Sequence, residues 1–283
     1  MAESMTEPRT VVKVVAGQAT SDGAGVRLKR TIGTRGLDHV DPFLLLDEFK
    51  SEEGSDYVAG FPDHPHRGFE TVTYMLAGAM EHRDHSGNHG LLGPGSVQWM
   101  TAGRGIIHSE MPRQHEGLMW GFQLWVNLPA KDKMGPPRYQ DIPPDRVPQV
   151  TTADGARLRI LAGEAAGRSG PVEGIVTRPL YLDVALPAAA RLVQPVPAGH
   201  NAFVYVFEGA GRFGGERVAA GHLGVLGPGD RVEAAAEGGA VRFLLLAAQP
   251  IGEPIARLGP FVMNTREELM QAVHDYQSGS FLA

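Results

Sequence analysis

Residues 74–78 read Tyr-Met-Leu-Ala-Gly, and residues 92–96 read Leu-Gly-Pro-Gly-Ser. Both patterns return in the second half of the chain, as Tyr-Val-Phe-Glu-Gly at residues 205–209 and Leu-Gly-Pro-Gly-Asp at residues 226–230. In each half the second pattern follows the first by a similar interval. A run of β-forming residues that ends on glycine, with a turn at a fixed distance, indicates a duplicated β-domain.

Glycine and proline punctuate the whole chain of 283 residues, with 37 and 21 occurrences. The runs between them are short and rich in β-branched and aromatic residues, and many alternate, as in Val26–Ile32 and Tyr181–Leu186. Such runs predict antiparallel sheets folded as a sandwich or barrel. Only the C-terminal segment has helical period, with an apolar stripe of Leu269, Ala272, Val273 and Tyr276. We therefore expect an all-β protein with a short C-terminal helix, which Asn264 or Thr265 could cap.

Six prolines from Pro129 to Pro148 divide the chain near its middle. This stretch shows little periodicity, which suits a stiff connector. We expect one β-domain over residues 1–130, a proline-rich linker over residues 131–148, and a second β-domain with the helix over residues 149–283.

The composition excludes several kinds of protein. Lys and Arg number 26 against 32 for Asp and Glu, and the net charge of −6 argues against a general nucleic-acid binder. The absence of cysteine excludes disulfides, thiolate zinc sites and cysteine nucleophiles. The first residues lack the basic-then-apolar layout of a signal peptide, and no run approaches the roughly 18 apolar residues of a membrane span. We expect a cytoplasmic protein that binds neither nucleic acid nor membranes.

Six of the eleven histidines fall between residues 64 and 108. The informative ones are His64-Pro-His66 and His108-Ser-Glu110, because residues two apart on a strand point to the same face. Imidazole and carboxylate without thiolate suit Fe, Mn, Ni, Cu or Zn, and non-haem Fe(II) where open positions remain. A chain of this composition would hold about 0.4 His-x-His pairs by chance, so histidines of turns and strand edges are the alternative. Two such pairs beside a Gly-Pro-Gly turn in an all-β chain favour a metal site.

Other polar residues near these pairs have weaker patterns. Glu70 follows His66 by four residues and is an alternative ligand or a supporting acid, although Gly68 between them weakens a regular strand. A polar stretch with turn residues, expected in a hairpin connection, holds His82, His85 and His89. Solvated surface is the expected place of Arg67, Arg83 and Arg104.

Two long segments resemble the pirin family of the cupin superfamily. They are residues 61–74, Phe-Pro-Asp-His-Pro-His-Arg-Gly-Phe-Glu-Thr-Val-Thr-Tyr, and residues 98–112, Gln-Trp-Met-Thr-Ala-Gly-Arg-Gly-Ile-Ile-His-Ser-Glu-Met-Pro. Residues 41–49 and 123–129 are further pirin-like stretches, and the likeness continues more loosely to the C-terminus. The resemblance implies a bicupin, in which two cupin β-barrels are joined by a linker and the N-terminal barrel carries the metal.

In pirins the metal is normally iron held by three histidines and one glutamate. The matching positions are His64, His66, His108 and Glu110, and the resemblance favours Glu110 over Glu70 as the acidic ligand.

The internal repeat argues against a second metal site. A shift of 131 puts Pro195 and Pro197 at the positions of the first histidine pair. A shift of 134 puts Arg242 and Leu244 at the positions of the second pair. We expect a C-terminal barrel without metal ligands, with a structural or regulatory role.

The resemblance also implies a function, since several bacterial pirins are similar in activity to quercetin 2,3-dioxygenase. We expect one Fe(II) per chain, replaceable by Zn, Mn, Ni or Cu, a small aromatic or phenolic substrate with dioxygen, and Glu110 as the catalytic proton acceptor. Candidates for the apolar walls of such a site, or for plain core, are Phe43, Phe69, Met75, Met100 and Trp125. The alternative is an iron-dependent regulator that binds a transcription factor or a metabolic enzyme without turnover, or an inert metal-stabilised fold. A monomer is expected, as in pirins generally.

Overall fold

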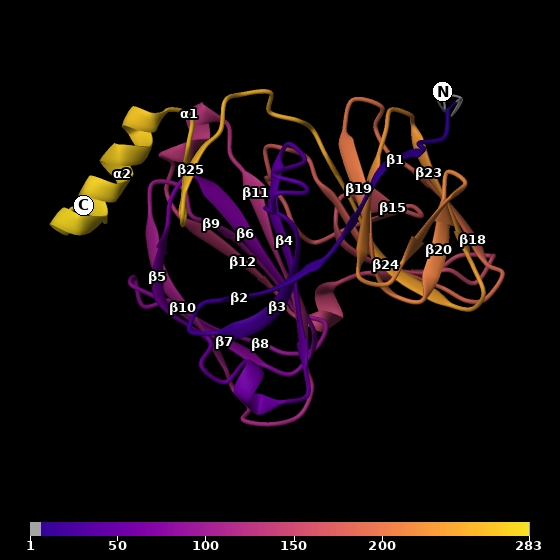
Figure 1. The fold of residues 1–283 in the computed structure, drawn as a ribbon, viewed down its shortest axis with the longest axis horizontal. Helices are drawn as coiled ribbons and strands as arrows, with labels where there is room; N and C mark the ends of the chain where they lie inside the picture. Colours follow the sequence, from indigo (N-terminus) through magenta and orange to yellow (C-terminus); the bar gives the residue numbers. More distant parts are fainter. Residues whose placement is uncertain (1–6, 283) are drawn as a thin grey trace. The chain divides into compact units, whose positions relative to one another are not determined.

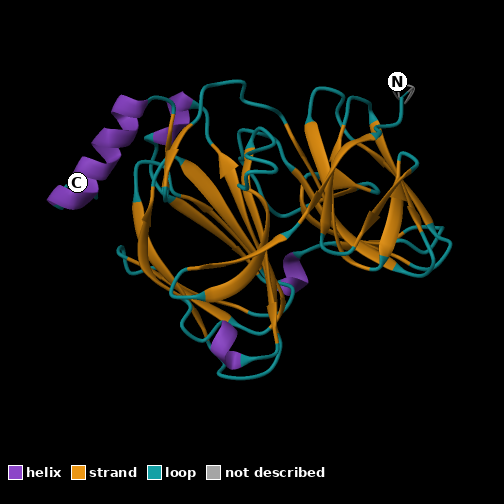
Figure 2. Cartoon of the chain, viewed as in Figure 1, coloured by secondary structure: helices purple, strands orange, loops and turns teal. Residues whose placement is uncertain are grey.

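The structure is a computed structural model that describes residues 7–282, and these residues form two compact units of β-strands (Figures 1 and 2). The first is called the histidine unit here and comprises residues 19–33, 43–144 and 251–282. The other is called the second unit and comprises residues 7–18, 34–42 and 145–250. The all-β prediction is confirmed, and so is the single longer helix at the C-terminal end.

The histidine unit has two main sheets that face each other as a barrel (Figure 1). The seven-stranded sheet has the order β12 (Arg138–Ile142), β9 (Val97–Thr101), β6 (Phe69–Ala77), β11 (Met119–Asn127), β4 (Phe43–Ser51), β3 (Val26–Ile32), β2 (Gln18–Asp22). The four-stranded sheet has the order β5 (Phe61–His66), β10 (Ile106–Pro112), β7 (Met80–Asp84), β8 (His89–Leu92). A hairpin of β25 (Ala256–Leu258) and β26 (Phe261–Met263) completes the sheets, and η1 (Gly54–Asp56) follows β4.

The second unit repeats this arrangement of seven and four strands. Its larger sheet has the order β1 (Val11–Ala16), β22 (His222–Leu226), β19 (Asn201–Glu208), β24 (Val241–Ala248), β17 (Leu180–Leu186), β14 (Arg157–Ala162), β13 (Gln149–Thr151). Its smaller sheet has the order β18 (Arg191–Pro195), β23 (Arg231–Ala236), β20 (Ala210–Phe213), β21 (Glu216–Ala219). The short strands β15 (Glu164–Ala165) and β16 (Arg168–Ser169) pair with each other.

Apolar side chains fill the interior of the second unit. Strand β23 occupies the sheet position that β10 has in the histidine unit, and its buried residues are Val232 and Ala234. Strand β18 occupies the position of β5, and its buried residues are Leu192 and Gln194. None of these four side chains is an imidazole or a carboxylate.

The repeat alignment that placed Arg242 and Leu244 at the second ligand pair is wrong. The turn at residues 92–96 precedes β9 of a seven-stranded sheet, whereas the turn at residues 226–230 precedes β23 of a four-stranded sheet. The two Gly-Pro-Gly turns are therefore not equivalent. Strands of the two units are matched correctly by their positions in the sheets, and not by these turns.

The structure divides the chain differently from the linear boundaries expected at residues 130 and 149. Strand β1 pairs with β22 and so belongs to the second unit, while residues 251–282 belong to the histidine unit. Residues 131–148, expected to be a plain linker, contain β12, which pairs with β9 and extends the larger sheet. The same stretch holds most of α1 (Ala130–Lys133) and η2 (Pro144–Arg146).

Helix α2 (Arg266–Ser278) begins where the sequence predicted. Thr265 accepts a hydrogen bond from the Glu268 backbone and Glu268 bonds back to the cap, which forms a capping box. Of the predicted apolar stripe, Leu269 and Ala272 are buried, Val273 is partly buried, and Tyr276 is 42% exposed. Among residues 7–282, no helix has the length and apolar character that crossing a membrane requires.

Candidate metal centre

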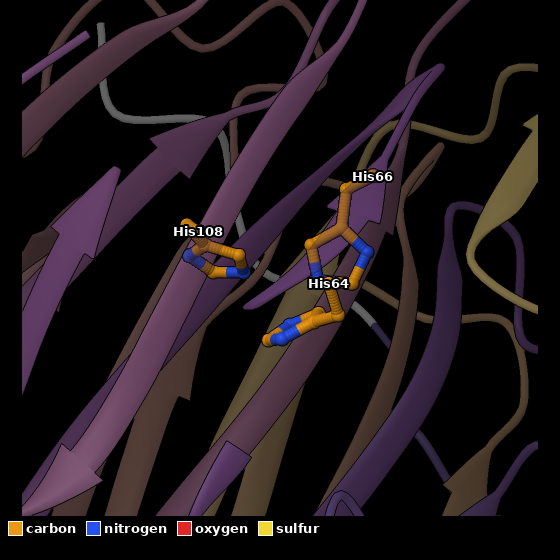
Figure 3. Close-up of side chains that lie close together, drawn as sticks. All are labelled: His64, His66 and His108. Carbon is orange, nitrogen blue, oxygen red and sulfur yellow. The ribbon is translucent and has the colours of Figure 1, made fainter. Parts of the chain in front are cut away.

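Three histidines from two neighbouring strands converge inside the histidine unit (Figure 3). His64 and His66 lie two residues apart on β5, and His108 on β10 pairs directly with His64 across the ladder. The ring centroids are 4.4 Å apart for His64 and His108, 4.7 Å for His64 and His66, and 4.9 Å for His66 and His108. One nitrogen from each ring lies within 4.8 Å of the other two. The group therefore contains both histidines of the predicted pair His64–His66 and the histidine of the predicted pair His108–Glu110.

The nitrogens of these rings fit a metal ion. The Nδ1 atom of His64 lies 2.8 Å from the carbonyl oxygen of Pro62, which can only accept, so this nitrogen carries the proton and Nε2 keeps its lone pair. The Nδ1 atom of His66 and the Nε2 atom of His108 are buried and have no hydrogen-bond partner among residues 7–282. Buried polar atoms are nearly always partnered, so unpartnered nitrogens on two rings of this group are consistent with a metal-binding site.

Burial also keeps the rings in the state that binds metals. It lowers the pKa of His66 well below its usual value, and neighbouring His64 lowers it further. Burial lowers the pKa of His108 in the same way, with contributions from His66, His64 and His82. These imidazoles are therefore neutral at physiological pH, which is the state that a metal ion requires.

Glu110 lies on the same face of β10 as His108 and is buried. The group of ligand atoms within 4.8 Å of one another does not include Glu110, whose Oε1 atom accepts a hydrogen bond of 3.0 Å from the Thr73 hydroxyl. The register of β10 against β5 shifts between these two residues. Glu110 nevertheless lines the same cavity as His64 and His66.

Glu70 lies on the opposite face of β6 from the cavity. Strand β6 keeps a regular register with β9 from residue 70 to residue 74, and Thr73, three residues on, lines the cavity. Because side chains alternate along a strand, Glu70 points the other way, where its Oε1 accepts a hydrogen bond from Thr101. Burial raises the pKa of Glu70 to about 7, although the hydrogen bond from Thr101 opposes this rise. This geometry does not support the alternative of Glu70 as a ligand.

His82 is a member of this region that sequence reasoning missed. It was expected in a polar connection with His85 and His89, which are indeed exposed, but His82 is 1% exposed. Its Nδ1 atom lies 3.3 Å from Nδ1 of His108. The alternation of Met80 with His82 along β7 was the available signal, since it places the histidine on the same face as an apolar residue.

Arg67 was expected at the surface and is instead 4% exposed. The C-terminal segment covers it, because Arg67 Nη1 donates to Asp275 at 2.6 Å and Nη2 donates to the Phe281 carbonyl at 3.1 Å. Its Nε donates to the carbonyl of Arg104, which is itself exposed as expected. Helix α2 therefore fixes the residue next to His66.

A cavity of about 530 Å³ opens beside the histidines, a size typical of small-molecule sites. Its aromatic walls are Phe49, Phe61 and Trp125. Of the five predicted wall residues only Trp125 lines it, while Phe69 packs behind Trp125 with ring centroids 4.3 Å apart. The sequence did not identify Phe49 and Phe61 as wall residues, because the pairing of distant strands decides which side chains face the cavity.

A polar row crosses the sheet opposite the histidines. Arg30 pairs with Asp47, Asp47 with Gln123, and Gln123 with Thr73 across four adjacent strands, and all four line the cavity. Arg30 holds both oxygens of Asp47 at 2.8 and 2.7 Å. Burial raises the pKa of Asp47 to about 6 against the opposing effect of Arg30, so this carboxylate is charged at neutral pH.

Comparisons with known proteins agree with this geometry. The family model described as Pirin matches residues 25–126, and the model described as Pirin C-terminal cupin domain matches residues 181–282. A Pseudomonas aeruginosa protein named "Putative quercetin 2,3-dioxygenase" is 52% identical over 97% of this chain and 99% of its own length. A pirin-like protein of Caulobacter vibrioides is also 52% identical, over 96% of this chain and 99% of its own.

The crystal structure of a quercetin 2,3-dioxygenase from Acinetobacter baumannii is similar to this fold with a TM-score of 0.89 and 35% identity, covering 98% of this chain and 99% of that one. The two β-barrels described above are thus cupin domains, as the family models indicate. The chain belongs to the pirin family.

Proposed function

We propose that this chain is a mononuclear metal-dependent dioxygenase of the quercetin 2,3-dioxygenase type, which opens a ring of a flavonol or a related phenol. The observation that carries the proposal is the group of three imidazoles, two with unpartnered buried nitrogens, beside a cavity that also holds Glu110. The name of the Acinetobacter structure, at 35% identity over nearly the whole chain, supports the same activity.

We assign His64, His66, His108 and Glu110 as the ligands of one Fe(II) per chain. Nitrogen and carboxylate donors without thiolate suit this ion and equally accept Zn, Mn, Ni or Cu. Bound Fe(II) would supply Lewis-acid polarisation of a substrate hydroxyl and electron exchange with dioxygen. Because His64, His66 and Glu110 line the cavity, an ion held by these residues would be accessible to a substrate there.

Glu110 is the residue that we assign as proton acceptor for the substrate hydroxyl. A general base must lie within hydrogen-bond reach of the proton that it removes, and Glu110 lines the cavity beside the histidines. The hydroxyl of Thr73 holds one oxygen of this carboxylate at 3.0 Å, which fixes its orientation. The other oxygen is the one that we expect to receive the proton.

The rest of the cavity suits a flat, hydroxylated molecule. Phe49, Phe61 and Trp125 offer apolar surface to aromatic rings. Arg30, Asp47 and the other members of the polar row offer partners for ring hydroxyls on the opposite wall. A metal sealed from solvent would favour the regulatory alternative, whereas a cavity beside the three histidines favours turnover.

Oxygen uptake by anaerobically Fe(II)-loaded protein on adding quercetin tests the proposal. With uptake normalised to bound iron, Glu110→Gln should lower the rate on the order of 10²- to 10⁴-fold, the usual contribution of a general base. The matched control is Glu70→Gln, which alters a buried glutamate on the opposite face of β6 and should retain the rate. A lack of uptake by protein that demonstrably holds iron would refute the proposal and favour the regulatory alternative.

A further inference from the structure

A chain of hydrogen bonds leads from His108 away from the cavity. The Nδ1 atom of His108 lies 3.3 Å from Nδ1 of His82, and the Nε2 atom of His82 lies 2.8 Å from the Tyr139 hydroxyl. Tyr139 in turn hydrogen-bonds the carboxylate of Asp84. His82 is buried between its two partners, with ring centroids 4.9 Å from His108 and 4.8 Å from Tyr139.

The outer end of this chain is a fixed acceptor. The Asp84 carboxylate already accepts hydrogen bonds from the backbone amides of Ser86 and Asn88, both at 2.9 Å, and from the Asn88 side chain at 2.7 Å. An ionised carboxylate accepts only, so the single hydroxyl proton of Tyr139 is donated to Asp84. The Tyr139 oxygen must then accept the proton of His82 Nε2.

This direction determines the tautomers of both histidines. A neutral imidazole carries one N–H, so His82, protonated at Nε2, accepts at Nδ1. His108 therefore donates from Nδ1 and keeps a lone pair on Nε2. This Nε2 atom is buried and has no hydrogen-bond partner within the described part of the chain.

We propose that His82, Tyr139 and Asp84 are positioning residues that hold His108 in the tautomer whose Nε2 can bind a metal. This inference rests on the proposed function only in that His108 is a metal ligand. Another ligand candidate is held in a simpler way, since Nδ1 of His64 bonds the carbonyl of Pro62. Acceptors beyond the ligands commonly orient metal-binding histidines and fix their tautomers.

The Tyr139 hydroxyl is the decisive group in this arrangement. Without it, His82 Nε2–H has no acceptor, and His82 can place its proton on Nδ1 instead. His108 would then accept at Nδ1 and carry its own proton on Nε2, pointing it at the metal position. Only the fraction of molecules in the competent tautomer would bind, which lowers the apparent affinity in proportion.

Ring-nitrogen NMR of the metal-free, full-length protein tests the proposal without any turnover. In the wild type, long-range ¹H–¹⁵N spectra should show His108 protonated at Nδ1 and His82 protonated at Nε2. In Tyr139→Phe, His108 should gain a population protonated at Nε2, and the affinity for Zn(II), measured by competition with a chelator, should fall on the order of 10-fold. Both readouts are independent of dioxygenase activity, so they separate this inference from the proposed reaction.

The matched control is Tyr57→Phe, which removes a hydroxyl bonded at 2.8 Å to the Gly117 carbonyl in the same unit. It should leave both the His108 tautomer and the Zn(II) affinity unchanged. If Tyr139→Phe does not fold, His82→Phe replaces it, and His108 should then populate both tautomers. A wild-type His108 protonated at Nε2 would overturn the proposal, as would folded variants whose tautomer and Zn(II) affinity match the wild type.

Discussion

Gly68 is the position where we expect a single methyl group to do most harm to the metal-binding region. It follows His66 by two residues, has φ +89°, and a Cβ placed on it would overlap the carbonyl oxygen of Val262 in the β25–β26 hairpin. Its amide donates to the Gly103 carbonyl at 2.8 Å, and its own carbonyl accepts from the buried Lys133 ammonium at 2.7 Å. Neither the turn nor the hairpin can move without breaking these contacts.

The size of the effect follows from these contacts. A left-handed φ costs an alanine about 1–2 kcal/mol. Separating the turn from the hairpin also weakens the backbone hydrogen bond between Val262 and Arg67, the one between Gly68 and Gly103, and the bond from Lys133, which together are worth about 3–4 kcal/mol. We therefore expect Gly68→Ala to destabilise the histidine unit by about 4–6 kcal/mol, at the upper end for a point substitution.

Urea unfolding followed by tryptophan fluorescence measures this loss, because Trp99, Trp120 and Trp125 are all the tryptophans and all lie in the histidine unit. With a slope of about 2 kcal/mol/M, the midpoint should fall by about 2–3 M. The control is Gly117→Ala, with φ +87° and open space around the added methyl, whose midpoint should fall by less than about 1 M. An equal fall of the urea midpoint in the two variants would refute the role of the contact with Val262, since only the strain of the left-handed φ would then destabilise the protein.

Two further predictions use the same unfolding assay. Glu70→Gln should gain stability relative to the wild type as the pH rises from about 4.5 to about 7.5, by at most about 3 kcal/mol. Burial raises the pKa of Glu70 to about 7. Between these pH values the folded wild type therefore binds more protons than the unfolded chain, and it loses stability as the pH rises. Parallel curves of stability against pH for the two proteins would contradict this prediction. Zn(II) at about 100 times its dissociation constant should stabilise the wild type by about 2.7 kcal/mol through mass action. His64→Ala, which alters the least buried of the three histidines, should lose this gain at the same Zn(II) concentration, and an equal gain would exclude His64 as a ligand.

The site was predictable from sequence wherever a local pattern fixes the face of a strand. His64 and His66 share a face because they are two residues apart, and His108 and Glu110 do so for the same reason. The capping box of α2 could also be predicted, since Thr265 and Glu268 satisfy each other within one turn. In each of these cases the interacting groups lie close together in the chain.

Sequence reasoning failed where the outcome depended on pairing between distant strands. His82 lies beside His108 because β7 pairs with β10, and its second partner, Tyr139, comes from β12, in a stretch expected to be a linker. Glu70 leaves the site because the register of β6 turns it to the opposite face.

The sequence by itself determined the β-architecture and the two ligand-like pairs, since each depends on spacing within a few residues. The tertiary structure alone decided that β5 and β10 pair, which three histidines meet, and which residues hold their tautomers. Residues 251–282 likewise joined the unit of strands far earlier in the chain. The physical reason is that side-chain alternation is a local property of the backbone, whereas strand partners and register are chosen by the burial and hydrogen bonding of the whole chain.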